Sequence, residues 1–230
     1  KELESKADLR LYTTALAMDD LEEIRRWLGY TQLNLYGLSY GTKAAQVYLR
    51  QHPARVRVIV MHGVVPINSS MWSDTPRLAQ DALDRVFDDC SRQEKCHDAF
   101  PNLKHEFDSL LRRLSEKPVK LKIAPPNSGQ QVEISIDDQS LREFVYGAMT
   151  SANSIRSLPL LLHLAYQENY QPLAQRLIPG GRGVPRGVFL SIACGEAISL
   201  IDLKRIPKVT KNTFMGEAPV RRLVATCKEW

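Results

Sequence analysis

The most constraining feature of the chain is a serine between two glycines, Gly37-Leu38-Ser39-Tyr40-Gly41, at a predicted strand-to-helix junction. Residues 32–36 before it alternate in polarity and predict a short strand. Residues 42–51 after it place apolar side chains on one face and predict a helix. A strand that runs directly into a helix must turn sharply, and the residue at the turn adopts a strained backbone. The motif therefore predicts that Ser39 presents its hydroxyl above the sheet edge as a nucleophile.

The residues around the serine have roles of their own in this interpretation. Positions two before and two after the nucleophile must be small, or their side chains would collide with the neighbouring strand and helix, and Gly37 and Gly41 meet that demand. The backbone N–H of Tyr40 opens the helix. We expect it to point toward a developing oxyanion, because a helix N-terminus favours negative charge.

The segment around the motif follows α/β order. Residues 14–28 repeat apolar side chains at helical spacing, and residues 56–62 form a run rich in β-branched residues. Such a run is typical of a strand buried on both faces of a parallel sheet. Residues 14–62 therefore predict helix, strand, serine turn, helix and strand, which is the order of an α/β fold.

The pattern changes after Pro66. Helices are predicted to begin at Pro76 and at Pro101. Residues 119–123 and 132–136 alternate in polarity and predict a hairpin around Pro125-Pro126-Asn127-Ser128-Gly129. A helix capped by Asp137 or Asp138 is predicted to end at Met149, and a further helix is predicted from about Ser157. We expect a core segment at 1–66, a mostly helical lid insertion at 67–215, and a return toward the core at 216–230.

Composition narrows the function classes. The 230 residues carry a net charge of +5 without a block of basic residues, which disfavours nucleic-acid binding. No apolar run approaches the ~20 residues of a transmembrane helix, and no signal peptide is recognised at Lys1-Glu2-Leu3-Glu4. The glycine-rich stretch 179–186 lacks the Gly-Lys-Ser/Thr of a phosphate loop and is interpreted as a surface loop.

Four cysteines leave two alternatives open. Cys90 and Cys96 lie six residues apart and suit a small disulfide loop, whereas Cys194 and Cys227 have no such local signal. The C-x-x-C spacing of a redox or zinc motif is absent, so no metal site is predicted. The alternative is four unpaired thiols in a reducing compartment, and an even count alone only leans toward an oxidising one.

Motifs along nearly the whole chain resemble α/β-hydrolase peptidases of the prolyl and tripeptidyl aminopeptidase type. They are Tyr12-Thr13-Thr14, Asp20 to Gly29, Leu35 to Thr42, Tyr48 to Pro53, Cys90…Cys96…Phe100-Pro101, Cys194-Gly195-Glu196 and Cys227-Lys228-Glu229-Trp230. The resemblance implies an α/β-hydrolase fold with part of its central parallel sheet and a large helical lid. It also implies a periplasmic or secreted peptidase, without a cofactor, that releases residues or short peptides from free N-termini.

The resemblance carries residue roles as well. It pairs Cys90 with Cys96 and Cys194 with Cys227. It makes Ser39 the nucleophile of an acyl-enzyme mechanism, and it offers Glu196 as a carboxylate that holds the substrate's amino group. An ordinary surface carboxylate is the alternative for Glu196.

Two parts of that family's site are not found in these 230 residues. The His-Gly-Gly-Pro-Gly type oxyanion loop would precede residue 1, and the triad's acid and histidine would follow Trp230, since chain order in this fold is Ser, Asp or Glu, then His. We therefore expect an internal fragment whose sheet is completed by a missing segment or a second chain. The in-chain alternatives for the base are His52, His62, His97, His105 and His163.

Three functions remain open at this point. The first is a serine peptidase, and the second is a carboxylesterase on the same fold. The third is a catalytically silent chain or binding module, because a serine without a base is a poor nucleophile.

Overall fold

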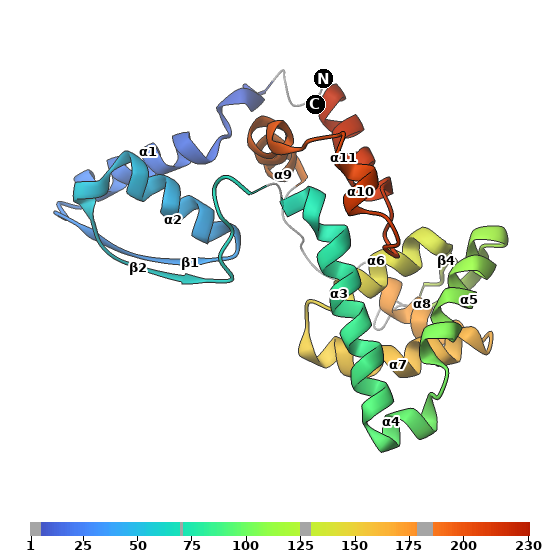
Figure 1. Ribbon diagram of the computed structural model, residues 1–230. Helices are drawn as coiled ribbons and strands as arrows, with labels where there is room; N and C mark the ends of the chain where they lie inside the picture. Colours follow the sequence, from blue (N-terminus) through green and yellow to red (C-terminus); the bar gives the residue numbers. More distant parts are fainter. Residues whose placement is uncertain (1–5, 70, 125–129, 179–185) are drawn as a thin grey trace. The chain divides into compact units, whose positions relative to one another are not determined.

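The computed structural model describes residues 6–69, 71–124, 130–178 and 186–230 (Figure 1). The chain divides into two compact units. The first, here called the serine unit, comprises Lys1–Thr75, Arg182–Val209 and Glu217–Trp230; the second, the helical unit, comprises Pro76–Gly181 and Thr210–Gly216. The predicted hairpin turn at 125–129 and the predicted loop up to residue 185 lie outside the described residues.

The serine unit begins with the predicted α/β order. A short 3₁₀ turn at Leu9–Leu11 comes first. It is followed by helix α1 (Thr14–Trp27), strand β1 (Leu33–Leu38), helix α2 (Tyr40–Gln51) and strand β2 (Val56–His62). The two strands pair in parallel, with Leu38 opposite His62 at the end that carries the serine. The observed β1 ends at Leu38 and α2 begins at Tyr40, whereas the sequence predicts a strand ending at residue 36 and a helix beginning at residue 42. Ser39 alone therefore separates β1 from α2.

A buried polar cluster fastens α1 to α2. Arg25, only 5% exposed, forms an ion pair with Glu22 at 2.7 Å, and its guanidinium also donates to the Tyr30 carbonyl. The fully buried Tyr48 on α2 donates its hydroxyl to the other Glu22 oxygen at 2.8 Å. The Arg25 hydrogen bond lowers the pKa of Glu22 from 4.5 to about 2, while burial and the adjacent carboxylate raise the pKa of Tyr48 to about 12. Helix α2 is therefore held against α1 by a hydrogen bond to a buried carboxylate as well as by packing.

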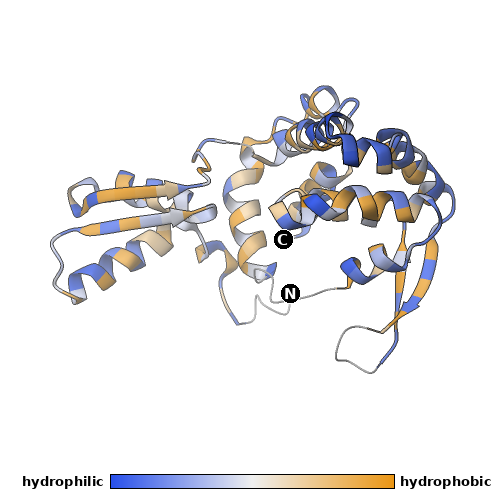
Figure 2. Cartoon of the chain, turned by 90° about the horizontal axis from the view of Figure 1, so that it is seen from below, coloured by the Kyte–Doolittle hydropathy of each residue, from blue (hydrophilic) through white to orange (hydrophobic). Residues whose placement is uncertain are grey.

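The expected burial of residues 56–62 on both faces is wrong for this structure. In β2, only Val56 and Ile59 are partly buried, and Val58 and Val60 are about half exposed. The described sheet containing β1 has two strands, so apolar side chains lack the neighbours that a wider sheet would supply. Figure 2 shows orange apolar stretches along the strands, interrupted by hydrophilic bands.

The remaining elements of the serine unit come from the second half of the chain. They are α9 (Arg186–Ile192), a π-helical turn η3 (Ala193–Ala197), a 3₁₀ turn η4 (Ile198–Leu200), α10 (Ile206–Val209) and α11 (Ala218–Glu229). Ile201, Ile206 and Val220 form a small core with Trp72 packed against it. Residues 186–209, which fall in the expected lid by sequence, thus cluster with the serine unit, because their apolar side chains pack there.

The second disulfide links two of these elements. Cys194 in η3 bonds to Cys227 in α11, 33 residues away, in the pairing that the family resemblance implies. Closing a loop of that length stabilises a fold by about 3.7 kcal/mol in the chain-entropy account, against about 2.2 kcal/mol for a six-residue loop. The disulfide therefore restrains the segment that carries Glu196.

The helical unit contains the larger core. Its elements are the main part of α3 (Met71–Arg92), then α4 (Glu94–Ala99), α5 (Leu103–Glu116), α6 (Asp138–Ala148), α7 (Ala152–Tyr166), α8 (Gln171–Leu177) and the antiparallel hairpin of β3 (Val119–Ile123) and β4 (Val132–Ile136). Phe107 lies at the centre of the core and contacts the rings of Phe87 and Phe214 at centroid distances of 5.9 Å.

Three helix starts differ from the predictions. Helix α3 begins at Met71 and includes Pro76, α5 begins two residues after Pro101, and α7 begins at Ala152 with Pro159 inside it. Proline marks a favourable early position in a helix, but preceding residues can extend the helix when their own side chains pack. The hairpin strands match their predicted bounds, and Asp137 caps α6 through a reciprocal pair of hydrogen bonds with Ser140.

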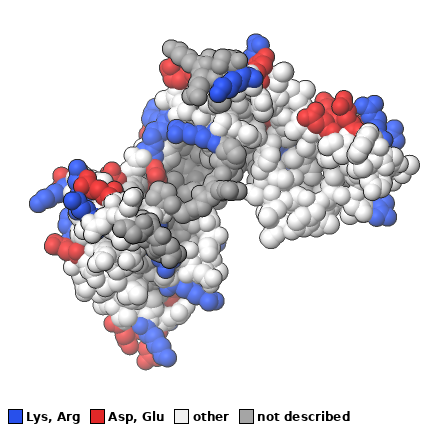
Figure 3. Space-filling model, turned by 180° about the vertical axis from the view of Figure 1, so that it is seen from behind, with Lys and Arg blue, Asp and Glu red and all other residues white. Residues whose placement is uncertain are grey.

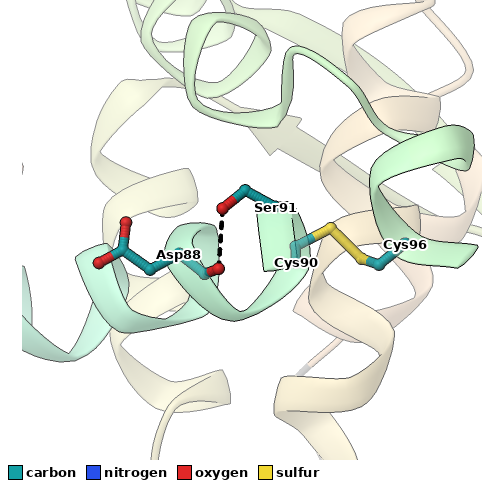
Figure 4. The surroundings of a disulfide bond; sticks show 4 residues. All are labelled: Asp88, Cys90, Ser91 and Cys96. Atoms are coloured by element: carbon teal, nitrogen blue, oxygen red, sulfur yellow. Dashed lines mark hydrogen bonds between the residues drawn. A yellow bond between two sulfur atoms is a disulfide. The ribbon is translucent and has the colours of Figure 1, made fainter. Parts of the chain in front are cut away.

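The first disulfide closes one end of the helical unit. Cys90 near the end of α3 bonds to Cys96 in α4, again as the resemblance implies (Figure 4). The neighbouring Ser91 hydroxyl donates to the Asp88 carbonyl at 2.8 Å. The described residues contain no unpaired cysteine.

Candidate active site

Ser39 has the strained backbone that the motif predicts. Its φ is 53° and its ψ is −118°, a conformation that non-glycine residues rarely adopt. The residue is exposed and lies at the N-terminal end of α2. Its N–H donates to the carbonyl of His62 at 3.0 Å, which ties the turn to the end of β2. An exposed serine held in a strained turn is typical of an enzyme nucleophile.

The two glycines of the motif are not equivalent. A Cβ on Gly37 would lie 2.5 Å from the Gly41 carbonyl oxygen and 2.9 Å from the Thr42 Cα, distances that real Cβ atoms do not show. A Cβ on Gly41 would meet no described atom within 4 Å. Among the described residues, the close approach therefore falls at Gly37, which must leave room for the backbone of Gly41 and Thr42.

Thr42, whose role the sequence analysis does not predict, stabilises the serine turn by hydrogen bonds from a buried position. It is fully buried, its N–H and hydroxyl both donate to the Ser39 carbonyl at 2.9 and 2.7 Å, and its hydroxyl accepts the Val65 N–H at 2.9 Å. Gln46 adds a bridge from the Thr42 carbonyl to the Val65 carbonyl, both at 2.9 Å. These bonds link the serine turn to the segment after β2.

Tyr40 occupies the first position of α2. The N–H at such a position has no partner within the helix and is available to an anion at the helix N-terminus. The side chain is anchored separately, through a 2.8 Å hydrogen bond between the hydroxyls of Tyr40 and Thr14. Burial raises the pKa of Tyr40, and the charge of Glu196 adds to this effect.

Glu196 has internal partners within the serine unit. It forms an ion pair with Lys43 at 2.8 Å, and it accepts hydrogen bonds from the N–H and the hydroxyl of Thr14. Burial would raise the pKa of Glu196, but the bonds from Lys43 and Thr14 outweigh burial and lower it. The carboxylate thus joins η3 to the starts of α1 and α2, and the sequence pattern predicts neither its contact with Lys43 nor its contact with Thr14.

A cavity of about 300 Å³ lies beside Ser39. Ser39, Tyr40 and Lys43 border it, and the other lining side chains are mostly apolar and come from two stretches, residues 65–72 and 188–197. All of these residues belong to the serine unit. Ser39 therefore lies at the edge of an apolar cavity.

The side chains of three histidines have other partners. His52 contacts Asp19 at 3.1 Å at the end of α2, His163 contacts Glu106 at 2.9 Å, and His105 lies 3.4 Å from the Ser109 hydroxyl. His62 lies opposite Leu38 in the strand pair, and its backbone carbonyl accepts the hydrogen bond from the Ser39 N–H. His97 lies in α4 of the helical unit.

Two further properties bear on the class of protein. None of the described helices is both long and apolar enough to cross a bilayer. Within the described ranges, no three His, Cys, Asp or Glu side chains group in a way that would hold a metal ion. On the face seen in Figure 3, basic and acidic side chains lie in small mixed groups.

A parallel strand pair, a serine at positive φ between strand and helix, and a helical insertion are features of the α/β-hydrolase fold. Sequence comparison agrees: the family model described as "alpha/beta hydrolase fold" matches residues 4–172, and the chain belongs to that family.

Two relatives are similar over shorter segments. "Putative hydrolase YuaR" of Escherichia coli is 34% identical over 110 residues, which is 45% of this chain and 22% of that protein. "Serine protease Hip1" of Mycobacterium tuberculosis is 35% identical over 80 residues, which is 34% of this chain and 15% of that protein. The matched segments thus span less than a quarter of either relative.

Proposed function

We propose that this chain carries the nucleophile of a serine hydrolase, and that Ser39 forms an acyl-enzyme with a peptide substrate. The observation that carries the proposal is the positive φ of Ser39 at the turn between β1 and α2. A serine protease among the similar proteins supports the choice of a peptidase.

The chemistry follows from the geometry of the turn. The Ser39 hydroxyl oxygen attacks the substrate carbonyl carbon, and the Tyr40 N–H donates to the oxyanion that forms. The tetrahedral intermediate expels the amine, and water then attacks the ester on Ser39 and releases the acid. A base accepts the serine proton during the first attack and donates it to the nitrogen of the departing amine; it then accepts a proton from the attacking water and returns it to the Ser39 oxygen as the acid leaves. A histidine on another strand end of the completed fold is our proposal for that base.

The finer features remain part of the proposal. We propose release from a free N-terminus, with Glu196 as the candidate partner of the substrate ammonium. Glu196 already pairs with Lys43, so the substrate ammonium would join this ion pair as a second cation at the carboxylate and leave Lys43 in place. Two disulfides are compatible with an exported protein. The exposed apolar strands support completion of the sheet by another segment or a second chain.

The test is covalent labelling with a serine-directed fluorophosphonate, applied to the 230-residue chain and to the product of its whole reading frame. We expect labelling that disappears in Ser39→Ala and persists in Ser115→Ala, whose native hydroxyl only donates to the Arg112 carbonyl at 2.7 Å. Absence of labelling in both proteins would overturn the proposal and favour a silent binding module.

A carboxylesterase is the second candidate, because the cavity beside Ser39 is apolar. Aminoacyl and peptidyl chromogenic amides, assayed beside short acyl esters, separate the two activities. Turnover of esters alone would exclude the peptidase and retain the serine hydrolase.

A further inference from the structure

We propose that the cavity beside Ser39 receives an apolar group attached to the substrate carbonyl, and that Trp72 and Phe189 select this group. The inference rests on the proposed function, because it takes Ser39 as the attacking residue. It adds the chemical class of the acyl part of the substrate.

The size of the cavity limits what can enter. Its volume is about 300 Å³, roughly twice that of the ~150 Å³ apolar protein cavity that binds benzene. That value lies at the small end of ligand pockets. The space suits one phenyl ring or a branched aliphatic group, and it is too small for several residues of a peptide.

The walls favour an apolar occupant. Trp72 and Phe189 are partly buried and meet edge to face, with ring centroids 5.5 Å apart and planes at 86°. Trp72 also packs against the small core of Ile201, Ile206 and Val220, which fixes its position. The buried alanines Ala193 and Ala197 complete the lining and leave the space that a larger side chain would occupy.

The charges around the cavity are already compensated. Among the described lining residues, Lys43 is the one that carries a formal charge at neutral pH. It pairs with Glu196 at 2.8 Å, and the two side chains are only 14% and 18% exposed. A charged substrate group would lose hydration in the cavity without meeting an unpaired opposite charge, which is unfavourable. The cavity therefore discriminates against acidic and basic groups.

The position of Ser39 decides which part of the substrate enters. The nucleophile borders the cavity, so a group one or two bonds from the attacked carbonyl lies nearest to it. In a peptide this group is the side chain of the residue that supplies the carbonyl. In an ester it is the acyl chain. Both sources share the same chemistry, and the substrates below distinguish them.

The experiment compares chromogenic anilides of phenylalanine, glycine, glutamate and lysine, together with 3-phenylpropanoyl and acetyl nitrophenyl esters. We expect kcat/KM for the phenyl substrates to exceed that for the glycine or acetyl substrates by about 10–100-fold, as filling an apolar pocket does. Preference among the anilides identifies a side chain, and preference among the esters alone identifies an acyl chain. Equal or better turnover of the charged anilides would overturn the inference.

Two cavity variants and a control locate the effect. Ala193→Phe fills the cavity and Phe189→Ala removes one wall, so each should reduce the phenyl preference about tenfold or more. Ala152→Phe, an equal change at an exposed position of α7, should leave the preference unchanged. Retention of the preference in Phe189→Ala and in folded Ala193→Phe would overturn the assignment of the cavity.

A binding measurement separates this inference from the proposed function. Ser39→Ala should still bind 3-phenylpropanol in ligand-observed NMR, and the added Ala193→Phe should abolish that signal. Fluorophosphonate labelling without any phenyl preference would overturn the inference and leave the nucleophile intact. Binding of 3-phenylpropanol without labelling would overturn the nucleophile and still place an apolar group in the cavity.

Discussion

The helical unit and the serine unit differ in how they are held together. Among the residues that the structure describes, the helical unit buries an apolar core of 22 residues from α3 to α8, the hairpin and the segment around Phe214. The second cluster, in the serine unit, has three buried members, and Trp27, Tyr36 and Leu38 in that unit are 85%, 69% and 56% exposed. Around Ser39, fixed geometry comes instead from hydrogen bonds and ion pairs. The difference teaches that a strained turn such as that at Ser39 can be held by hydrogen bonds without a large local core.

The largest expected effect comes from truncating the helical core. Phe107→Ala removes a ring that is 1% exposed and should destabilise the helical unit by about 3–5 kcal/mol. Val60→Ala in β2 removes a side chain that is 52% exposed and should change stability by less than about 0.5 kcal/mol.

Chemical denaturation followed by far-UV circular dichroism measures both variants. Equal losses for Phe107→Ala and Val60→Ala would break the comparison, because they would show that β2 is buried against something in solution. A large loss for Phe107→Ala alone would sharpen it.

The sequence predicted the order of elements well where the pattern is local. The hairpin strands, helix α1 and the cap at Asp137 depend on neighbouring residues, and they lie at or within one residue of their predicted places. Burial of β2 was predicted wrongly, because a β-branched run reports strand propensity, whereas burial depends on what packs against the strand. The grouping of residues 186–209 depends on distant partners and carries no local signal.

A smaller effect is expected at the serine turn itself. Gly37→Ala places a Cβ 2.5 Å from the Gly41 carbonyl oxygen, so the turn must shift at a cost of about 1–3 kcal/mol. Gly41→Ala meets no described atom within 4 Å and is the matched control.

Stability and fluorophosphonate labelling should be measured on both variants. We expect Gly37→Ala to lose most labelling by misplacing Ser39 while the helical unit keeps its unfolding transition. Loss of labelling in Gly41→Ala to the same extent would contradict the steric argument and point to contacts with residues outside the described ranges.

The candidate site shows the same limit of sequence reasoning. Ser39, Gly37 and the Tyr40 N–H follow from one short motif whose spacing dictates the turn. Thr42 lies directly after the motif and was missed, because its role depends on Val65, 23 residues away. The bonds of Glu196 to Thr14 span 182 residues, so no local pattern could reveal them.

The smallest expected effect concerns the polar cluster that holds α1 against α2. Arg25 lowers the pKa of Glu22 from 4.5 to about 2, so the ionised carboxylate stabilises the fold. That stabilisation is complete above pH 4.5 and is lost as the pH falls toward 2, because the unfolded chain binds the proton first. Glu22→Gln should therefore be less stable than the native protein at pH 6, and the gap should narrow steadily between pH 4.5 and 2. Denaturant unfolding at pH 6, 4 and 3 measures the gap, with Tyr48→Phe, which removes only the 2.8 Å hydroxyl contact, as a milder comparison. If the difference in unfolding free energy stays constant across this range, packing and not the charge of Glu22 holds α1 against α2. The contrast between an apolar helical unit and a polar serine unit would then fail at this cluster.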